Sequence, residues 1–546
     1  MLHSILPSEH HIILVVNQTL IPRVAYFCME FGLGEDLPVY AGGLGILAGD
    51  MIKAAGDLRL PLTGVGIFWS EGYTVQRLTP AGGVIDEHPA VPRAALVPTG
   101  AVASVRIRGR DVAITAYRVD RPGIAPLYLL EPVDEADRWI TRRLYGGAGD
   151  DRVAQELVLG IGGVRILRAL GVPVDLYHFN EGHAVLAALE LVRERTEAGM
   201  AWDEALRAVR AEVVFTTHTP VAAGNETHRL ELLADLGLPA ERLVELGGEP
   251  FSMTVAGLKL STITNAVAEL HAATAQRMWA HVEGAAPIIA VTNGVHPPTW
   301  QDERLRVAYA RGTLWEAHQQ AKRELLTLIR LRTGHTLLED RLLVGFARRA
   351  AAYKRADLIL RDPARLGALL GARRLQLVFA GKAHPHDAEG KKIIAQLHGA
   401  ARQNPGSIAF LENYDIGVGQ KLTRGCDVWL NTPRRPMEAS GTSGMKAAMN
   451  GVLNVSVLDG WWPEGCEHGV NGWQIGDGFE GPGQDAHDGR ALLDTLEEVV
   501  IPKYESDRVG WGKMMAASIE MSQWRFSSYR MLEDYYERVY RAADVM

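Results

Sequence analysis

The chain has 546 residues, of which 47% are apolar and 22% charged, so it can bury more than one core and resembles an ordinary soluble protein. Its formal net charge of −8 disfavours a general role on nucleic acid or anionic membranes, and any anion site must be a local basic cluster. Cys28, Cys426 and Cys466 show neither disulfide nor metal-site spacing, which favours a reducing compartment. The apolar patch Ile12 to Val16 is too short for a signal peptide or a membrane span, so we predict a cytoplasmic protein.

Strand-like runs alternate with helical runs in both halves of the chain. In the first half, strands are predicted at Val24–Glu30, Leu62–Trp69, Val105–Val119, Leu127–Leu130, Leu176–Phe179 and Val213–Thr217. In the second half they are predicted at Leu342–Ala347, Leu375–Ala380, Ile408–Leu411, Cys426–Leu430 and Leu453–Leu458. Helices such as Asp151–Leu170 and Ala184–Thr196 fall between them. The alternation predicts an α/β fold of two Rossmann-like, doubly wound domains that face a central crevice.

We place the boundary between the domains near residue 290. Residues 1–290 would form the first domain, residues 291–510 the second, and residues 511–546 a C-terminal helix that packs back on the first. Doubly wound domains bind ligands at the carboxyl ends of their strands. Polar side chains follow predicted strands at His218, at Arg348 with Arg349, and at Lys382, which supports a site in the crevice.

Residues 438 to 446 read Glu-Ala-Ser-Gly-Thr-Ser-Gly-Met-Lys and carry the strongest functional signal. The small residues let backbone N–H groups crowd around a ligand at the start of a helix, where anions are favoured. Lys446 could be a solvated surface group, but beside an anion cradle it is a candidate Schiff-base lysine, which would indicate pyridoxal phosphate.

Two further segments could bind anions. Tyr40 to Gly45 is a glycine loop before a helical run, and it could be a phosphate loop or simply a tight turn. Arg348-Arg349-Ala-Ala-Ala-Tyr353-Lys354-Arg355 directly follows a buried-looking strand, so an anion pocket is favoured there over a solvated charged face.

The run from Glu438 to Lys446 resembles the cofactor-lysine segment of the α-glucan (glycogen, starch, maltodextrin) phosphorylases. Arg23 to Phe31 and the glycine loop are similar to other signatures of that family, and the resemblance extends to about Glu464. Ser443-Gly444 is typical of the short bacterial type. The resemblance implies the glycosyltransferase B architecture, with pyridoxal phosphate on Lys446. It also implies phosphorolysis of α-1,4-glucans from the non-reducing end, with release of α-D-glucose 1-phosphate and retention of configuration.

The same resemblance assigns site residues. Those expected at the substrate phosphate or the reacting sugar are Arg349, Lys354, Gly43 and His218. Those expected to hold the cofactor are Lys446, Arg348, Thr442 and Tyr414. Those expected to bind the glucan are Glu438, Ser440, Gly441, Asn293, Asn265, Tyr353 and His183. The chain departs from the family at Ala351-Ala352, where many members have His-Glu, and at Asp415, where the family has arginine.

Other functions were weighed against this one. A retaining glycosidase needs two carboxylates about 5 Å apart, and the sequence offers only Glu438. The several histidines lack the spacing of a zinc site, so no metal is predicted. A sugar-nucleotide-dependent glucosyltransferase of the glycogen or starch synthase kind is the main alternative, and an inactive glucan-binding protein is a third. The expected partners are an α-1,4-glucan or maltodextrin and inorganic phosphate, without nucleic acid or membrane, and a homodimer is left open.

Overall fold

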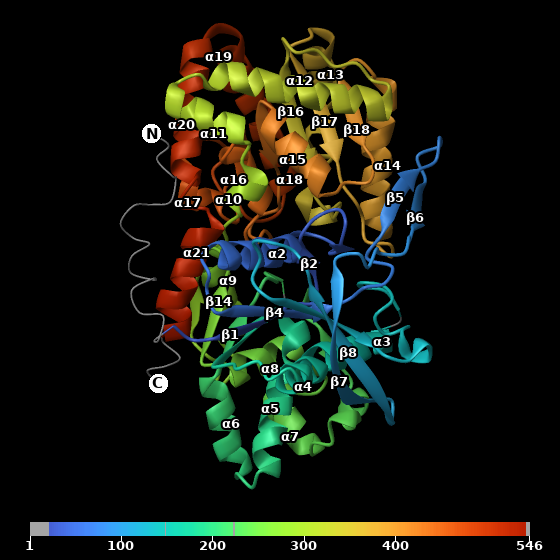
Figure 1. Ribbon diagram of the computed structural model, residues 1–546. Coiled ribbons are helices and arrows are strands. Elements are labelled where there is room, and N and C mark those ends of the chain that lie inside the picture. Colours follow the sequence, from blue (N-terminus) through green and yellow to red (C-terminus); the bar gives the residue numbers. More distant parts are fainter. Residues whose placement is uncertain (1–20, 148, 222–223, 542–546) are drawn as a thin grey trace.

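The computed structural model describes residues 21–147, 149–221 and 224–541, and Ile12 to Val16 lie outside these ranges. The chain forms two α/β lobes, one above the other in Figure 1, and each lobe is built around one large sheet. Among the described residues no helix is both long enough and apolar enough to span a membrane.

The first sheet has nine strands in the order β15-β14-β11-β10-β1-β4-β9-β8-β7. Their bounds in that order are Ile288–Ala290, Ile263–Ala266, Val213–Thr216, Leu176–Asn180, Val24–Phe27, Leu62–Ile67, Leu127–Pro132, Arg110–Val119 and Leu96–Ile107. The strands from β15 to β9 are parallel, and β8 and β7 extend the edge in antiparallel pairing.

The second sheet has six parallel strands in the order β18-β17-β16-β19-β20-β21. Their bounds in that order are Ile408–Leu411, Leu375–Ala380, Leu342–Ala347, Val428–Asn431, Leu453–Val457 and Gly472–Ile475. Counted along the chain, this is the 3-2-1-4-5-6 order of a Rossmann sheet. The first sheet has the same order around β1. The direction in which successive strands are added therefore reverses between β1 and β10 in the first sheet, and between β16 and β19 in the second. The predicted fold class is therefore confirmed.

One predicted strand was wrong. Val105–Val119 is a hairpin, in which β7 ends at Ile107 and β8 begins at Arg110. Arg108 and Gly109 form the turn with φ of 53° and 74°. Two central residues with positive φ match the twist of a tight hairpin. The apolar alternation continues on both sides of this short turn, which is why the sequence suggested one long strand.

The predicted helix Asp151–Leu170 is also interrupted. It consists of α3 (Gly149–Leu157), a wider π turn (Val158–Gly162) and α4 (Gly163–Ala169). Glycine allows a close approach inside the π turn, because a Cβ on Gly160 would lie 2.6 Å from the backbone nitrogen of Ala187. The neighbouring helix α5 spans Leu186–Glu197, close to its predicted bounds.

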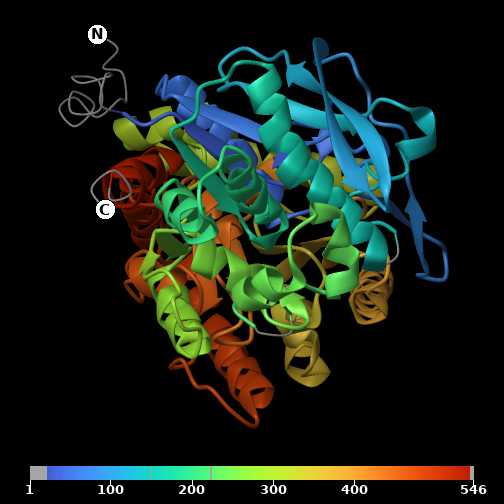
Figure 2. The same cartoon turned by 90° about the horizontal axis from the view of Figure 1, so that it is seen from below.

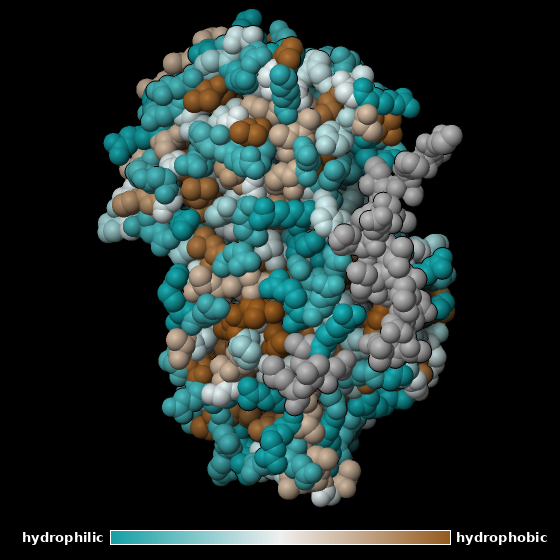
Figure 3. All heavy atoms as spheres, turned by 90° about the vertical axis from the view of Figure 1, so that its left-hand side faces the viewer, coloured by the Kyte–Doolittle hydropathy of each residue, from teal (hydrophilic) through white to brown (hydrophobic). Residues whose placement is uncertain are grey.

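The C-terminal segment connects the two lobes. Helix α20 (Arg508–Ser522) packs on the second sheet, whereas α21 (Ser528–Asp534) and the π turn Tyr535–Tyr540 belong to the core of the first lobe. These red elements run down one side of Figure 1, and Figure 3 shows that the same face carries a mixture of polar and apolar residues. The hydroxyl of Tyr540 lies 2.7 Å from His178 Nδ1, and Asn265 Nδ2 donates to the hydroxyl of Tyr535 at 3.1 Å.

A hairpin of the first lobe reaches the second lobe. Strands β5 (Val75–Leu78) and β6 (Val84–Glu87) lie beside helix α14 (Ala388–Gln403), as Figures 1 and 2 show. Gln76 Nε2 donates to the carbonyl of Ala383 at 2.8 Å, and the Ala383 N–H donates to Gln76 Oε1 at 2.9 Å. This paired amide contact holds the two lobes together beside the crevice.

Replacing Gly49 with alanine is expected to lower stability by about 1–3 kcal/mol through overpacking. Gly49 lies in α2 (Gly43–Asp57), and an added Cβ would lie 2.1 Å from the carbonyl oxygen of Gly32. Gly367→Ala is the matched control, because it lies in helix α13 (Pro363–Gly371) with open space around the added methyl. Thermal unfolding should give a lower Tm for G49A and an unchanged or higher Tm for G367A.

Candidate active site

The reversal points of the two sheets place polar groups at the strand ends. Glu30 follows β1, Glu181 follows β10 and Arg348 follows β16, while residues 438–446 follow β19 after a short loop. Because ligands of doubly wound sheets bind at such points, these segments define the candidate site.

Glu30 fixes the glycine loop. Its buried carboxylate accepts the backbone N–H of Ala41 at 2.6 Å and that of Gly42 at 3.2 Å, both on Oε2. The hydroxyl of Tyr145 donates to Oε1 at 2.7 Å. Gly43, the first residue of α2, is exposed, and a Cβ built on it would meet no atom within 4 Å. The loop is thus held from behind and leaves the start of a long helix open to an anion.

The basic run after β16 meets the first residue of the 438–446 segment. The Glu438 carboxylate forms ion pairs with Lys354 and with Arg348, the latter at 2.6 Å. Burial raises the pKa of Glu438, but the two cations outweigh it and bring the pKa to about 2. Arg349 lies beside Tyr353, Tyr73 and Tyr145. The structure therefore brings Lys354, a predicted phosphate ligand, and Arg348, a predicted cofactor ligand, together with Glu438, a predicted sugar ligand.

Arg355 differs from the other cations of this run. It is fully buried, and its guanidinium donates to the carbonyls of Thr432 and Pro433 and to Asp488 at 2.6 Å. These bonds satisfy its donors within the second lobe, so we interpret Arg355 as a structural residue.

The segment after Glu438 turns sharply. Gly441 has a φ of +88° and precedes α16 (Thr442–Ala448), and a Cβ there would lie 3.3 Å from Arg348 Nη2. The hydroxyl of Ser440 is buried without a hydrogen-bond partner among the described residues. A loop from Asp459 to Trp461 supports the turn, since the Trp461 N–H donates to the Ser440 carbonyl at 2.9 Å. Ser440 Oγ is thus available to a ligand.

Asp459 is a supporting residue that the sequence did not reveal. Its carboxylate accepts the N–H of Glu438 at 2.9 Å and that of Gly460 at 2.8 Å. Burial, followed by the nearby Glu438 charge, raises the pKa of Asp459 from 3.8 to about 7. It therefore fixes the backbone from which the Glu438 side chain extends.

The raised pKa of Asp459 predicts a pH-dependent stability. The stabilisation that goes with a raised carboxyl pKa is complete below 3.8 and is lost as pH rises through about 7. Asp459→Asn is neutral at all pH values, so the Tm of the wild type should fall relative to that of D459N between about pH 4 and about pH 8. Scanning fluorimetry across this range measures the difference, and parallel Tm profiles would contradict it.

Lys446 is buried in α16. Its Nζ lies 3.7 Å from the ring centroid of Trp300, a residue of α10 (Pro297–Trp300). Burial lowers the pKa of Lys446 to about 8, with Asp50 raising it and Lys53 lowering it. A buried amine with a reduced proton affinity is suited to condense with an aldehyde.

The surroundings of Lys446 fit pyridoxal phosphate. Arg348 supplies a cation beside Gly441, where the missing side chain leaves room next to the guanidinium. Tyr414 lies near Arg348, and burial raises the pKa of Tyr414 to about 12, so its hydroxyl stays neutral. Thr442 is the first residue of the lysine's own helix. The amine can bind the aldehyde of the cofactor, and the cation can bind its phosphate.

His218 is held by the end of β10. Its Nε2 lies 2.6 Å from Asn180 Oδ1, and its backbone N–H donates to Glu181 Oε2 at 2.7 Å. Burial lowers the pKa of His218 to about 3, so the ring is neutral. Glu181 adopts a φ of +79°, and its carboxylate also accepts the hydroxyl of Thr219. The sequence did not reveal this role of Glu181, because the role depends on contacts with a turn that is distant along the chain.

The predicted asparagines have different surroundings. Asn293 is buried, and its Oδ1 has no hydrogen-bond partner among the described residues, so this oxygen is free for a ligand. Asn265 is fully buried, with bonds to Thr216 and to the hydroxyl of Tyr535. The side chain of Asn265 is therefore engaged in the core of the first lobe, where Tyr535 covers it.

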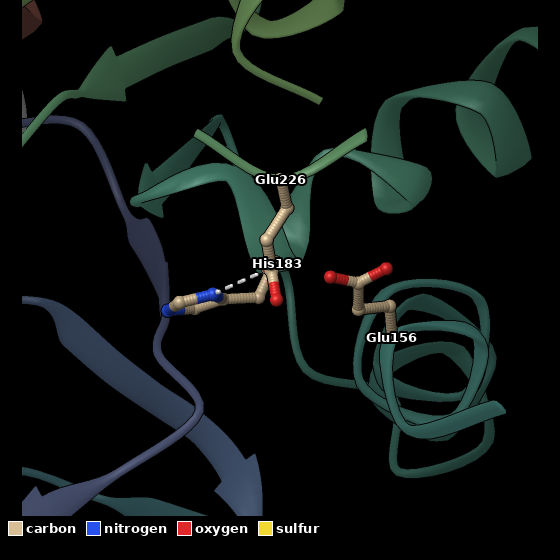
Figure 4. Close-up of side chains that lie close together, drawn as sticks. All are labelled: Glu156, His183 and Glu226. Carbon is tan, nitrogen blue, oxygen red and sulfur yellow. Dashed lines mark hydrogen bonds and ion pairs between the residues drawn. The ribbon is translucent and has the colours of Figure 1, made fainter. Parts of the chain in front are cut away.

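His183 belongs to a compact polar cluster with Glu156 and Glu226. Figure 4 shows the three side chains pointing toward one another, and one ligand atom from each lies within 4.8 Å of the others. Arg152 already supplies a cation, because its Nε donates to Glu226 at 2.7 Å and its Nη2 lies 3.2 Å from His183 Nδ1. His228 lies 2.6 Å from Glu156. We interpret the group as an ion-pair cluster around Arg152, and the absence of a metal stays a prediction.

The model of the carbohydrate phosphorylase family matches residues 306–464, which include the basic run and the 438–446 segment. A maltodextrin phosphorylase of Thermococcus litoralis is 38% identical, over 95% of this chain and 70% of its own. A glycogen phosphorylase of Mycobacterium tuberculosis is 39% identical, over 97% of this chain and 72% of its own length. A glycogen phosphorylase of Aquifex aeolicus is 36% identical, over 95% of this chain and 86% of its own length. With two doubly wound sheets and these relatives, the chain belongs to the carbohydrate phosphorylase family.

Proposed function

We propose that this protein phosphorolyses α-1,4-glucans or maltodextrins from the non-reducing end and releases α-D-glucose 1-phosphate with retention of configuration. The observation that carries the proposal is the pairing of Glu438 with Arg348 and Lys354, in the segment that ends at the buried Lys446. The proposal includes a cytoplasmic location and domains of residues 1–290, 291–510 and 511–546. Within the last segment, α21 and the π turn after it pack back on the first lobe, whereas α20 packs on the second.

The phosphate-binding part of the mechanism uses cations and one amide. Arg349 and Lys354 would neutralise the substrate phosphate, and the Gly43 amide would donate to it from the opposite lobe. When bound at Lys446, pyridoxal phosphate supplies a 5′-phosphate that can exchange a proton with the substrate phosphate. Arg348, Thr442 and Tyr414 would hold that group in place. Fixed donors of this kind stabilise developing charge more effectively than water does.

The sugar-binding part uses neutral groups and one carboxylate. Ser440 Oγ and Asn293 Oδ1 have unfilled hydrogen-bonding capacity, which supports their assignment to sugar hydroxyls. His218 is neutral at physiological pH, so it would act as a hydrogen-bonding group and not as a cation. Glu438, Gly441, Tyr353 and His183 complete the proposed sugar contacts, whereas Asn265 would support the pocket from within the core.

The test offers maltodextrin with inorganic phosphate, and separately a sugar nucleotide with a glucan acceptor. We expect glucose 1-phosphate of the α configuration in the first assay and no chain extension in the second. Borohydride reduction followed by peptide mapping should place a pyridoxyl group on Lys446. Sugar-nucleotide-dependent extension without phosphorolysis would instead support the synthase-like alternative.

A further inference from the structure

The β5–β6 hairpin of the first lobe bonds a loop of the second lobe that directly follows β17. Residues 381–383 form this loop, and the buried side chain of Gln76 exchanges two hydrogen bonds with the backbone of Ala383. A third bond comes from Lys382, whose Nζ donates to the carbonyl of Thr74 at 2.9 Å. Lys382 is a strand-end cation that the proposed mechanism does not use, and it serves here to join the two lobes.

The amide of Gln76 is held in one orientation by Asp86. Its Nε2 donates to Asp86 Oδ1 at 2.7 Å, and Lys391 of α14 donates to Asp86 Oδ2 at 2.6 Å. Asp86 Oδ1 also accepts the hydroxyl of Thr74 at 2.9 Å. Because an ionised carboxylate only accepts hydrogen bonds, it selects the nitrogen end of the Gln76 amide, and the oxygen end then faces the N–H of Ala383. Both ends of this side chain are therefore fixed by their partners.

The residues on either side of Arg349 bond the end of β17 and the loop after it. The N–H of the residue before Arg349 donates to the carbonyl of Ala380 at 3.2 Å, and the N–H of the residue after it donates to the carbonyl of Lys382 at 2.8 Å. Glycine allows the close packing, since a Cβ on Gly381 would lie 2.5 Å from the carbonyl oxygen of Arg348. The backbone of Arg349 thus stands between two bonds to the segment that the hairpin holds.

We propose that Gln76 is a positioning residue for Arg349, through which the first lobe sets the place of a phosphate-binding cation of the second lobe. The inference rests on the proposed function, because it takes Arg349 to bind the substrate phosphate. Tyr73 supports the same connection, since it lies three positions before Gln76 and is one of the tyrosines beside Arg349. The hairpin thereby completes the phosphate site across the boundary between the lobes.

The experiment is a double-mutant cycle on phosphorolysis by the full-length protein, with inorganic phosphate and maltodextrin varied separately. Gln76→Met keeps the length of the side chain and removes its hydrogen bonds. Q76M should lower kcat/KM for phosphate at least about fivefold, since each lost hydrogen bond typically costs about twofold to tenfold. The KM for maltodextrin should stay within about twofold of the wild-type value. In the Arg349→Ala background, Q76M should change kcat/KM for phosphate by less than about twofold, because the group that Gln76 positions is gone.

Arg77→Ala is the matched control. Arg77 is the next residue of β5, is exposed, and pairs with Glu87 of the same hairpin at 3.0 Å. R77A should therefore keep the wild-type KM for both substrates. A purely structural role of Gln76 would instead lower the activity toward both substrates together.

The outcomes separate the two proposals. Equal losses from Q76M in the two backgrounds, or equal rises of both KM values, would overturn the role of Gln76 and leave the proposed function standing. A wild-type protein without phosphorolysis would overturn both. If Q76M does not fold, Asp86→Asn takes its place, because it breaks the pair with Lys391 and weakens the acceptor of the Gln76 amide. D86N should lower kcat/KM for phosphate at least about twofold, and only where Arg349 is present. An unchanged value would then overturn the inference.

Discussion

Lys446→Ala is expected to abolish phosphorolysis and cofactor binding while leaving the fold intact. Removing one donor to a developing charge costs about 10²–10³ in kcat. Loss of Lys446 removes the attachment point of pyridoxal phosphate, whose 5′-phosphate is the proposed proton partner of the substrate phosphate. Activity should therefore fall below about a thousandth of the wild-type value. The measurement combines initial rates of glucose 1-phosphate release with the near-ultraviolet absorbance of the purified protein.

Lys421→Ala is the control for this variant. Lys421 lies on α15 (Ile416–Gly425), and its half-exposed side chain pairs with Glu324. It should retain full activity and cofactor. A fully active K446A protein would remove the basis of the phosphorylase assignment, whatever its absorbance.

Arg349→Ala is expected to lower kcat by about 10²–10³, equivalent to about 2.7–4 kcal/mol of transition-state stabilisation. Arg349 lies beside Tyr353 at the crevice and has no carboxylate partner among the described residues, so its charge is available to a substrate anion. Arg349→Lys keeps the charge but loses the planar, two-pronged geometry, and should be intermediate. Steady-state kinetics with phosphate and glucan varied separately provide the values.

Arg355→Ala distinguishes a catalytic loss from a structural one within the same basic run. It leaves the buried Asp488 without its 2.6 Å partner, so a lower Tm is expected. R349A should keep the wild-type Tm. If R349A has a lower Tm and its loss of activity is explained by the fraction of protein that is unfolded, Arg349 is not a phosphate ligand.

Much of the fold could be predicted from local pattern. Apolar runs such as Leu342–Ala347 and Leu375–Ala380 are buried throughout, and buried parallel strands read as continuous apolar segments. The hairpin at Arg108-Gly109 was missed because a two-residue turn barely interrupts the alternation. The π turn at Val158–Gly162, where Gly160 allows the close approach of a neighbouring helix, was missed because no local pattern encodes such a contact.

The site was predictable where its residues are contiguous and unpredictable where they are not. Lys446 and Ser440 stand in one recognisable run. The pairing of Glu438 with Lys354 joins residues 84 positions apart, and the bond from Trp300 to Asp50 spans 250 positions. Asp459 and Glu30 act through backbone N–H groups, which carry no sequence signal at all.

The return of Tyr535 and Tyr540 to the first lobe has a consequence for synthesis on the ribosome. Tyr540 lies 362 positions after His178, whose ring it contacts. At about 5–20 residues per second, translation needs roughly 20–70 s to cover that span. During this time His178 and the fully buried Asn265 lack the aromatic cover that Tyr535 and Tyr540 provide. The nascent first lobe therefore exposes an unfinished face to chaperones until Tyr540 has emerged.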